Sequence, residues 1–264
     1  MPPARKRARS YDSARTRAAV VAQFDHVRAG VGALTPDQLE LPTRLGDWTV
    51  RELAVHIAMT VGAVARAVGL PEPAEAEVRL LQWPFTTAAW ADAVDEGVRA
   101  ASLAGEGLVE LYDRTAADLA GVLAGASDDR LVQTRQGAMR LGDQLVTRTV
   151  ELIVHTDDMN DATGLDLPYE RQALAACVRL LADALAVKAP GGSVEVRIPP
   201  YAVVQCVEGP RHTRGTPPNV VETDSLTWIR LATGRVGWDA ARGSAAVSAS
   251  GERSDLSGVL PVMS

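Results

Sequence analysis

TVELIVHTDDM, at residues 149–159, lies within a long segment of helical character. Successive residues of a helix are rotated by about 100°, so Glu151 and His155 lie one turn apart and about 40° from each other around the axis. Two such side chains are either an ion pair in contact with solvent or two ligands of a metal site. The residues around them bear on which of the two they are.

The helix that contains this stretch, at about residues 142–163 and ended by Gly164, has apolar residues on two sides. Between the two sides runs a narrow polar stripe of Gln144, Thr147, Arg148, Glu151, His155 and Asp158. A solvated Glu–His pair at this spacing would contribute only roughly a few tenths of a kcal/mol. The two apolar sides leave little of the helix free to face water, which argues against that interpretation. They consist of Leu141, Leu145, Leu152 and Met159 on one side, and Val146, Val150, Ile153 and Val154 on the other.

The rest of the first two thirds of the chain predicts further helices, at about residues 13–31, 47–69 and 95–123. Thr49, followed three residues later by Glu52, has the pattern of a capping box at the start of the second helix. The intervening residues 70–92 contain three prolines and predict a long connection. Four long helices with one elaborate connection favour a bundle. A fifth helix is expected at about residues 166–190.

His56 is a candidate partner for the Glu–His pair. It lies on a small, apolar face of the second helix, whereas Arg51 and Arg66 project from another side. A single histidine on such a face is more often a hydrogen-bonded core residue than a ligand. Together with Glu151 and His155, however, it completes a set of two imidazoles and one carboxylate. With an open fourth position this is the chemistry of a catalytic zinc site, although the same set also suits iron, nickel or manganese.

The pattern changes after Gly192. The segments SVEVRIP, YAVVQCVEG, NVVET and GSAAVSASG alternate or cluster β-branched residues as strands do. The segment DSLTWIRLATGR predicts a helix that Asp224 caps and Gly234 ends. We therefore expect a small α+β domain behind a boundary between about residues 165 and 190.

Composition excludes several classes of protein. A chain of 264 residues, 47% of them hydrophobic, suits a globular protein of two domains or one large one. A net charge of −6 argues against a nucleic-acid partner. No apolar run reaches the roughly 18 residues of a membrane span.

The first ten residues and the two cysteines bear on location. The basic start, MPPARKRARS, has no apolar segment after it, so it predicts a disordered basic tail and not a secretion signal. Cys177 and Cys206 lie in different segments without the spacing of a metal site. Reduced, buried cysteines and a cytoplasmic protein are the expectation.

Two motifs resemble a known enzyme family. GDWTVRELAVHIA is similar to the W-x-V-x-D/E-L-x-x-H segment, and VELIVHTDDM to the E-L-x-x-H-x-x-D segment, of the mycothiol-dependent maleylpyruvate isomerase family, a branch of the DinB/YfiT-like metalloenzyme superfamily. The resemblance covers roughly residues 12–163. It implies a four-helix bundle in which His56, Glu151 and His155 bind a divalent metal, usually zinc. It also implies that Trp48 anchors the packing and that Asp158 supports a ligand or caps the helix.

The C-terminal segment, from about residue 193 to 262, resembles the bacterial sterol-carrier-protein-like domain through VETD…W…L…GR…W followed by SGERSDLS…LP. In the sterol carrier fold a sheet and helices enclose an apolar tunnel. Here the domain is short and the loop GPRHTRGTPPN is polar, which argues against lipid carriage. Arg211, His212 and Arg214 of this loop either bind an anionic group of a ligand or are solvated charges of a turn-rich surface loop.

The predicted fold is therefore multidomain, with a disordered basic tail at 1–11, a DinB-like four-helix bundle at 12–165, a linking helix at 166–192 and a small α+β sterol-carrier-like domain at 193–264. The resemblance implies a metal-dependent thiol enzyme. In it a divalent cation activates mycothiol, or a similar low-molecular-weight thiol, for conjugation or cis-trans isomerisation of an electrophilic small molecule. Arg148, Arg211 and Arg214 are candidates for anchoring anionic groups.

Two alternatives stay open at this point. The first is a non-catalytic protein of the sterol carrier type that binds lipid or another small molecule. The second is a bundle in which the metal serves only stability. The sequence does not name the electrophile, the metal or the oligomeric state.

Overall fold

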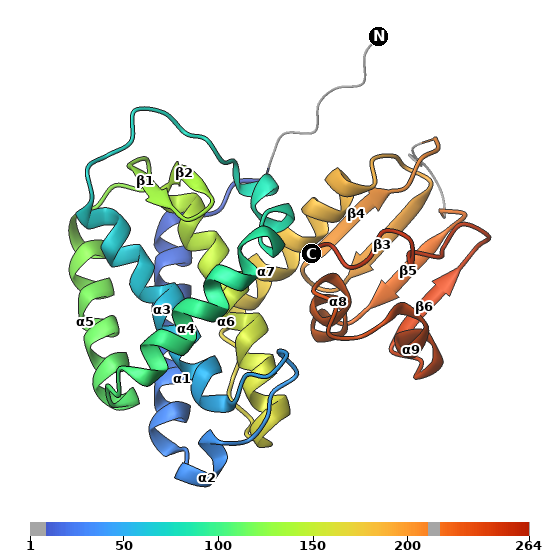
Figure 1. Ribbon diagram of the computed structural model, residues 1–264. Coiled ribbons are helices and arrows are strands. Elements are labelled where there is room, and N and C mark those ends of the chain that lie inside the picture. The colour runs from blue at the N-terminus through green and yellow to red at the C-terminus, as the bar shows by residue number, and fades with distance from the viewer. Residues whose placement is uncertain (1–8, 211–216, 264) are drawn as a thin grey trace.

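The computed structural model describes residues 9–210 and 217–263, which form a helical region followed by a smaller region with a sheet (Figure 1). In the helical region, α1 and α3 each pack against α5 and α6, which makes a four-helix bundle. This arrangement confirms the predicted fold class. The four helices are α1 (Ser13–Ala33), α3 (Val50–Gly69), α5 (Leu108–Gly125) and α6 (Leu141–Thr163), with a short α2 (Pro36–Leu39) after α1.

The predicted limits of three bundle helices hold to within about three residues, because local capping sets them. Thr49 accepts a hydrogen bond from the backbone of Glu52, and the Glu52 carboxylate accepts one from the backbone of Thr49, so α3 begins with the expected capping box. Gly164, at φ +69°, adopts the left-handed conformation that ends α6.

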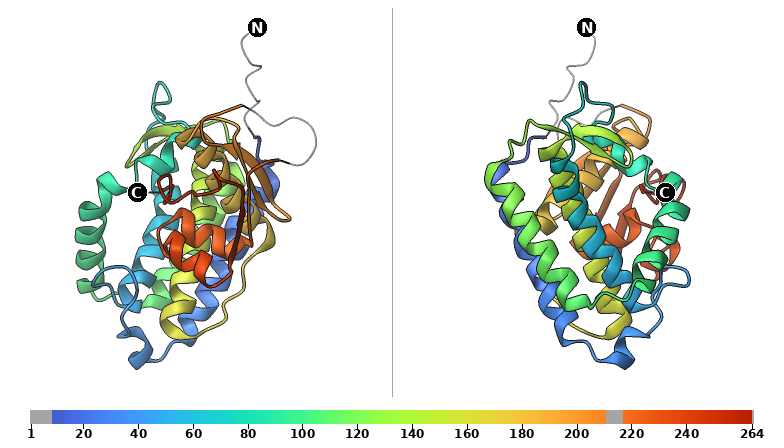
Figure 2. Two further views of the ribbon diagram at one scale, coloured as in Figure 1. Left: turned by 90° about the vertical axis from the view of Figure 1, so that its right-hand side faces the viewer. Right: turned by 60° about the vertical axis from the view of Figure 1, so that its left-hand side comes forward.

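The predicted helix at 95–123 is wrong in one respect, because the segment forms two helices. These are α4 (Ala91–Leu103) and α5 (Leu108–Gly125). Gly105, at φ +75°, and Gly107, which caps the start of α5, break the chain between them. At this break the chain changes direction between α4 and α5, and both helices pack against α3 (Figures 1 and 2).

The connection at 70–92 and the segment before α6 contain short elements that the sequence did not reveal. Two 3₁₀ helices, η1 (Leu80–Phe85) and η2 (Ala88–Trp90), lie within the connection. An antiparallel hairpin of β1 (Leu131–Thr134) and β2 (Gly137–Arg140) leads directly into α6. Each strand has only four residues, too few for a clear alternation of apolar and polar side chains.

Helix α6 is buried on two opposite sides, as its sequence predicts. Its leucine side, with Leu145 and Leu152, packs into a core formed with α1, α3 and α5. Its valine side, with Val150 and Ile153, packs into a second core that continues through α7 (Arg171–Lys188) to the sheet. The polar stripe between the two sides is therefore held inside the protein.

The C-terminal region is a four-stranded sheet of order β4-β3-β5-β6, with one parallel pair, β3 and β5. Helix α7 packs against α1 and α6 of the bundle and against β4 and α8, so it joins the two regions (Figure 1). The short helix α9 was not predicted. The elements are β3 (Val194–Ile198), β4 (Ala202–Cys206), β5 (Val220–Thr223), α8 (Ser225–Ala232), α9 (Trp238–Gly243) and β6 (Val247–Ser250).

The inner face of this sheet is filled by the protein's own side chains. Val194, Val196 and Ile198 of β3 are fully buried, and they share a core with Trp228 of α8. Cys177 and Cys206 are buried and not disulfide-bonded, as predicted.

Among the described residues, one helix, α3, is long and apolar enough to cross a membrane by length and composition alone. It contributes Leu53, Ile57 and Val61 to the core of the bundle and contacts α4, α5 and α6. Its apolar character is therefore explained by packing within the protein.

Candidate metal centre

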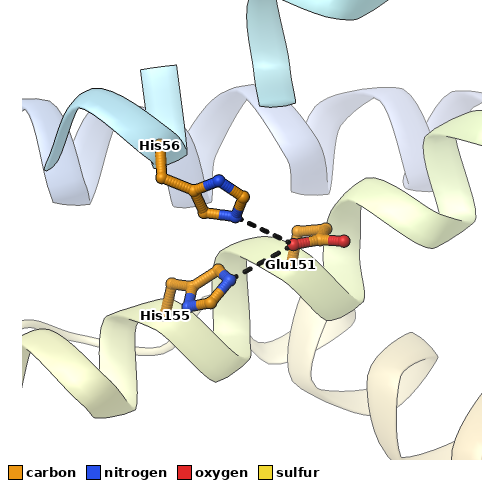
Figure 3. A group of neighbouring side chains, drawn as sticks. All are labelled: His56, Glu151 and His155. Carbon is orange, nitrogen blue, oxygen red and sulfur yellow. Dashed lines mark ion pairs between the residues drawn. The ribbon is translucent and has the colours of Figure 1, made fainter. Parts of the chain in front are cut away.

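The structure brings His56, Glu151 and His155 together where α3 packs against α6 (Figure 3). Both imidazole rings point their Nε2 atoms at the Glu151 carboxylate. Nε2 of His56 lies 3.6 Å from Oε2 of Glu151, and Nε2 of His155 lies 3.3 Å from the same oxygen. One potential ligand atom from each residue lies within 4.8 Å of the other two. Two helices, nearly a hundred residues apart in sequence, thus aim three donors at one point.

These separations suit a small divalent cation. Ligand atoms about 2.0–2.1 Å from a tetrahedral zinc ion lie about 3.3–3.4 Å from one another. The two distances to Glu151 are within a few tenths of an ångström of that value. The rings of His56 and His155 meet edge to face with their centroids 4.7 Å apart, which leaves both Nε2 atoms free to face the carboxylate.

Burial and charge shift the pKa values of all three groups. Burial lowers the pKa of His56. Burial alone would raise the pKa of Glu151, but hydrogen bonds from His155 and His56 and the charge of Arg148 hold it well below its ordinary value. Burial alone would likewise lower the pKa of His155, but hydrogen bonds with Asp158 and Glu151 raise it. The lowered pKa values of His56 and Glu151 favour the protonation states that a metal ion requires of its ligands, whereas the raised pKa of His155 means that a metal ion would have to displace a proton from it.

The first neighbours of the cluster fix the rings in place. Trp48 lies against His56 with the ring centroids 5.1 Å apart, and its Nε1 donates a hydrogen bond to Asp95 of α4 at 2.7 Å. Trp48 therefore packs against a site residue and also ties α4 to the start of α3.

Asp158 contacts His155 from the side away from Glu151. Its Oδ2 lies 2.8 Å from Nδ1 of His155. A carboxylate in this position fixes the tautomer and the orientation of an imidazole, so that Nε2 carries the free lone pair. The hydrogen bond joins Asp158 to one of the three candidate ligands.

The carboxylates of Asp157 and Asp158 also hold three arginines that sequence reasoning missed. Arg235 donates to both oxygens of Asp158, at 3.2 and 2.9 Å, and Arg230 donates to both oxygens of Asp157, at 2.9 and 2.6 Å. Arg44, from the loop before α3, donates to both aspartates. The two partners of each ion pair lie about 75 to 115 positions apart in the chain, so no local sequence pattern indicates the pairs.

Two cavities meet at the cluster. One, of about 670 Å³, is lined by α3, α6, the β1–β2 hairpin and part of α4, and includes His56, Arg148 and Glu151. The other, of about 660 Å³, lies between Trp48, α4 and the C-terminal region, and includes all three cluster residues and Arg235. The two cavities therefore share His56 and Glu151, and His155 lines the second one.

The remaining candidates have different outcomes. Arg148 is buried beside the cluster, with a guanidinium nitrogen 3.8 Å from Oε1 of Glu151 and another donating to the backbone of Thr60 at 3.1 Å. Arg66 was expected on another side of α3 from His56, but its long side chain lines the same cavity. Residues Arg211, His212 and Arg214 lie outside the described residues.

Comparison with known families agrees with the geometry. The family model described as the mycothiol maleylpyruvate isomerase N-terminal domain matches residues 20–160, more than half of the chain, and includes the whole cluster. The chain belongs to this mycothiol maleylpyruvate isomerase family. A second family model, described as a bacterial sterol carrier protein ortholog, matches residues 170–262.

Two solved structures share the fold of this family member. They are the mycothiol-dependent maleylpyruvate isomerase and a variant of it in which alanine replaces a histidine, with TM-scores of 0.58 and 0.59. Each is 17% identical to the chain, and each alignment covers 93% of this chain and 95% of the other. At this identity the likeness concerns the fold. No curated protein sequence matches the chain.

Proposed function

We propose that the protein is a metal-dependent thiol enzyme. In this proposal His56, Glu151 and His155 hold a divalent cation, of which zinc is the first candidate, and mycothiol or a similar low-molecular-weight thiol attacks an electrophilic small molecule. The reaction is cis-trans isomerisation or conjugation. The observation that carries the proposal is the convergence of three metal-type donors, from two helices, at the meeting point of two cavities.

The donor set leaves room for catalysis. Structural zinc sites in proteins are usually closed by four side chains, whereas catalytic sites have three protein ligands and an open position. Among the described residues only His56, Glu151 and His155 form a group of this kind. When bound there, a divalent cation would lower the pKa of a thiol at the open position and so supply thiolate at neutral pH.

The chain's own residues orient the reaction. Asp158 keeps Nε2 of His155 directed at the site, and Trp48 packs against the ring of His56. Arg148 keeps a buried positive charge beside Glu151, where negative charge on a substrate would be attracted.

Isomerisation and conjugation both need only the thiol and the electrophile as reactants. The thiolate adds to one carbon of a double bond conjugated to a carbonyl group, a C–S bond forms, and the π pair moves to the carbonyl oxygen. Rotation about the resulting single bond, followed by loss of the thiolate, restores the double bond in the trans form. If the neighbouring carbon takes up a proton before the thiolate leaves, the product is a conjugate.

The alternative of a lipid carrier is less favoured. A sterol carrier would place its tunnel at the inner face of the sheet. Here side chains of α7 and Trp228 of α8 fill that space and pack with the buried side chains of β3. Two cavities of about 670 and 660 Å³ lie at the cluster. A thiol cosubstrate and two reduced cysteines fit a cytoplasmic enzyme.

The test is an assay of maleylpyruvate isomerisation and of thiol conjugation by the zinc-loaded protein, with mycothiol present and absent. We expect turnover that requires both the thiol and the metal. His155→Ala should lose stoichiometric zinc and the turnover together, whereas His26→Ala, at a histidine of α1, should keep both. Full zinc retention by His155→Ala would refute the ligand assignment.

A further inference from the structure

The cavity of about 670 Å³ beside His56 and Glu151 has an unusual distribution of charge. We call it the arginine chamber, because Arg66, Arg135 and Arg148 line it. Glu151 is the one acidic residue among its described lining residues, and it belongs to the cluster itself. Outside the cluster, the charged side chains among the described lining residues are therefore all cationic.

The three arginines lie at two levels. Arg148 is buried at the inner end, 3.8 Å from Glu151. Arg66 of α3 and Arg135 of the β1–β2 turn are exposed, so they mark the end of the chamber that reaches the surface. A ligand that enters between Arg66 and Arg135 would extend inward to Arg148 and the cluster.

Arg66 and Arg135 lack the partners that most arginines of this protein have. Within the described ranges, neither forms an ion pair with a carboxylate, whereas Arg51 of the same helix pairs with Glu40. Arg66 donates only to the backbone oxygen of Met59, at 3.0 Å. Burial lowers the pKa of Arg66, and the nearby charge of Arg135 lowers it further. Two unpaired cations that repel each other at a cavity entrance form a ready site for an anion.

The walls indicate the kind of anion. Met59, Ala63, Val94 and Val98 provide an apolar surface on α3 and α4. Opposite them, α6 contributes Gln144, which is 3% exposed and whose Oε1 is buried without a hydrogen-bond partner among the described residues. A short carbon chain that has a hydroxyl or other donor and ends in carboxylates would satisfy both walls.

The second cavity contrasts with this one. It contains Asp47, Asp92 and Asp95 together with Arg99 and Arg235. Its acidic residues outnumber its arginines, so an anionic ligand would be repelled there relative to the arginine chamber.

We propose that the arginine chamber is a carboxylate subsite, in which Arg66 and Arg135 bind the carboxylate of the electrophilic substrate that lies farthest from the metal centre. The identification of that ligand as the electrophile rests on the function proposed above. Arg66 and Arg135 are thereby specificity-determining residues that select substrates with a negative charge at the remote end.

The test is calorimetric titration of the full-length protein with fumarate, a four-carbon unsaturated dicarboxylate, and with fumaramide, its uncharged analogue. We expect fumarate to bind and fumaramide to bind at least about tenfold more weakly. Arg66→Gln and Arg135→Gln should each weaken fumarate binding about tenfold. Arg51→Gln, at a half-buried arginine of α3 outside both cavities, should leave it unchanged, and all three variants should retain the zinc content of the natural protein.

Several results would overturn the subsite. These are no binding of fumarate, equal binding of fumarate and fumaramide, or fumarate binding by Arg66→Gln and Arg135→Gln at the level of the natural protein. Repeating the titration with metal-free protein separates this proposal from the enzyme function. Charge-selective binding that depends on both arginines, in a protein without thiol-dependent turnover, would keep the subsite and reject the function. Turnover whose KM is insensitive to both substitutions would keep the function and reject the subsite.

Discussion

Two clusters of buried charge lie within eight residues of each other on α6, and they differ in how completely they are satisfied. Asp157 and Asp158 each contact three side chains, which include the arginines Arg44, Arg230 and Arg235. Glu151 contacts two imidazoles and one more distant guanidinium, and it faces two cavities. The aspartate cluster is closed by protein groups, and the glutamate cluster is open.

The difference indicates that the charges of the aspartate cluster stabilise the fold, whereas those of the glutamate cluster are available to a ligand. Buried carboxylates cost free energy unless they are paired, and bidentate arginines pair them fully. The aspartate cluster uses this pairing to join the C-terminal region to α6, since Arg230 and Arg235 follow the sheet strand β5 in the chain. Among the described residues the His56–Glu151–His155 cluster has one arginine beside it, Arg148, at 3.8 Å from Glu151, and its donor atoms face two cavities.

The largest expected effect is stabilisation by zinc. In the proposed function the open cluster binds metal only when α3 and α6 are packed, so free zinc at about a thousand times its Kd should raise the free energy of unfolding by about 4 kcal/mol. Urea denaturation with and without zinc measures the rise. His56→Ala should abolish the rise, and His26→Ala should preserve it. An equal rise in both variants would place the metal elsewhere.

The next effect is the cost of opening the closed cluster. Asp158→Ala leaves Arg235 and part of Arg44 without a carboxylate, so it should lower the free energy of unfolding of the metal-free protein by about 3 kcal/mol. Glu151→Gln should cost about 1 kcal/mol or less, because the contacts of Glu151 are longer, at 3.3 to 3.8 Å. Denaturation of both metal-free variants measures the two costs. Equal costs would remove the distinction between the clusters.

The contact between the two clusters, from Asp158 to His155, should have a smaller effect, on zinc affinity, that can be measured separately. Asp158 contacts His155 and Asp157 does not, although both pair with arginines. Asp158→Asn should therefore weaken zinc affinity by about 10- to 100-fold, while Asp157→Asn should leave it unchanged. Competition with a chromophoric chelator measures both affinities. A similar loss in the two variants would mean that the aspartates act only through the fold.

The smallest effect is on the pH dependence of stability. Burial alone would raise the pKa values of Asp157 and Asp158, but hydrogen bonds from Arg230 and Arg44 to Asp157, and from His155 and Arg235 to Asp158, lower them. A lowered pKa in the folded state contributes stability above the unfolded value of about 4, and this contribution is lost as the pH falls further. Between about pH 4 and 2, Asp158→Asn should reduce the slope of unfolding free energy against pH by at most about 1.4 kcal/mol per unit. An unchanged slope in metal-free protein would contradict the charge pairing.

The two clusters also differ in how far the sequence predicts them. The open cluster lies on a stripe of α6 between two apolar sides, and that periodic pattern, with the family motifs, pointed to His56, Glu151 and His155. The stripe is buried between two cores as expected. The helix limits that capping residues set were also predicted well, as at Thr49 and Gly164.

The closed cluster and the arginine chamber escaped prediction for physical reasons. Arg44, Arg230 and Arg235 lie in loops or short helices, and only tertiary packing brings them to α6. Arg66 was expected on another side of α3 from His56, but its side chain reaches the same cavity, because the direction of a Cβ atom does not fix where a long, flexible side chain ends. Arg135 lies in the turn of a hairpin whose strands were too short to recognise.

The most direct test of the proposed metal centre is the position of the metal itself. Anomalous diffraction at the zinc edge, from crystals of the zinc-loaded protein, locates the ion without assumptions about its ligands. A zinc ion bound as proposed gives one peak between α3 and α6, bonded to Nε2 of His56, Nε2 of His155 and a carboxylate oxygen of Glu151 at about 2.0–2.2 Å. A fully occupied zinc ion at any other group of side chains, with these three unbound, would contradict the proposal.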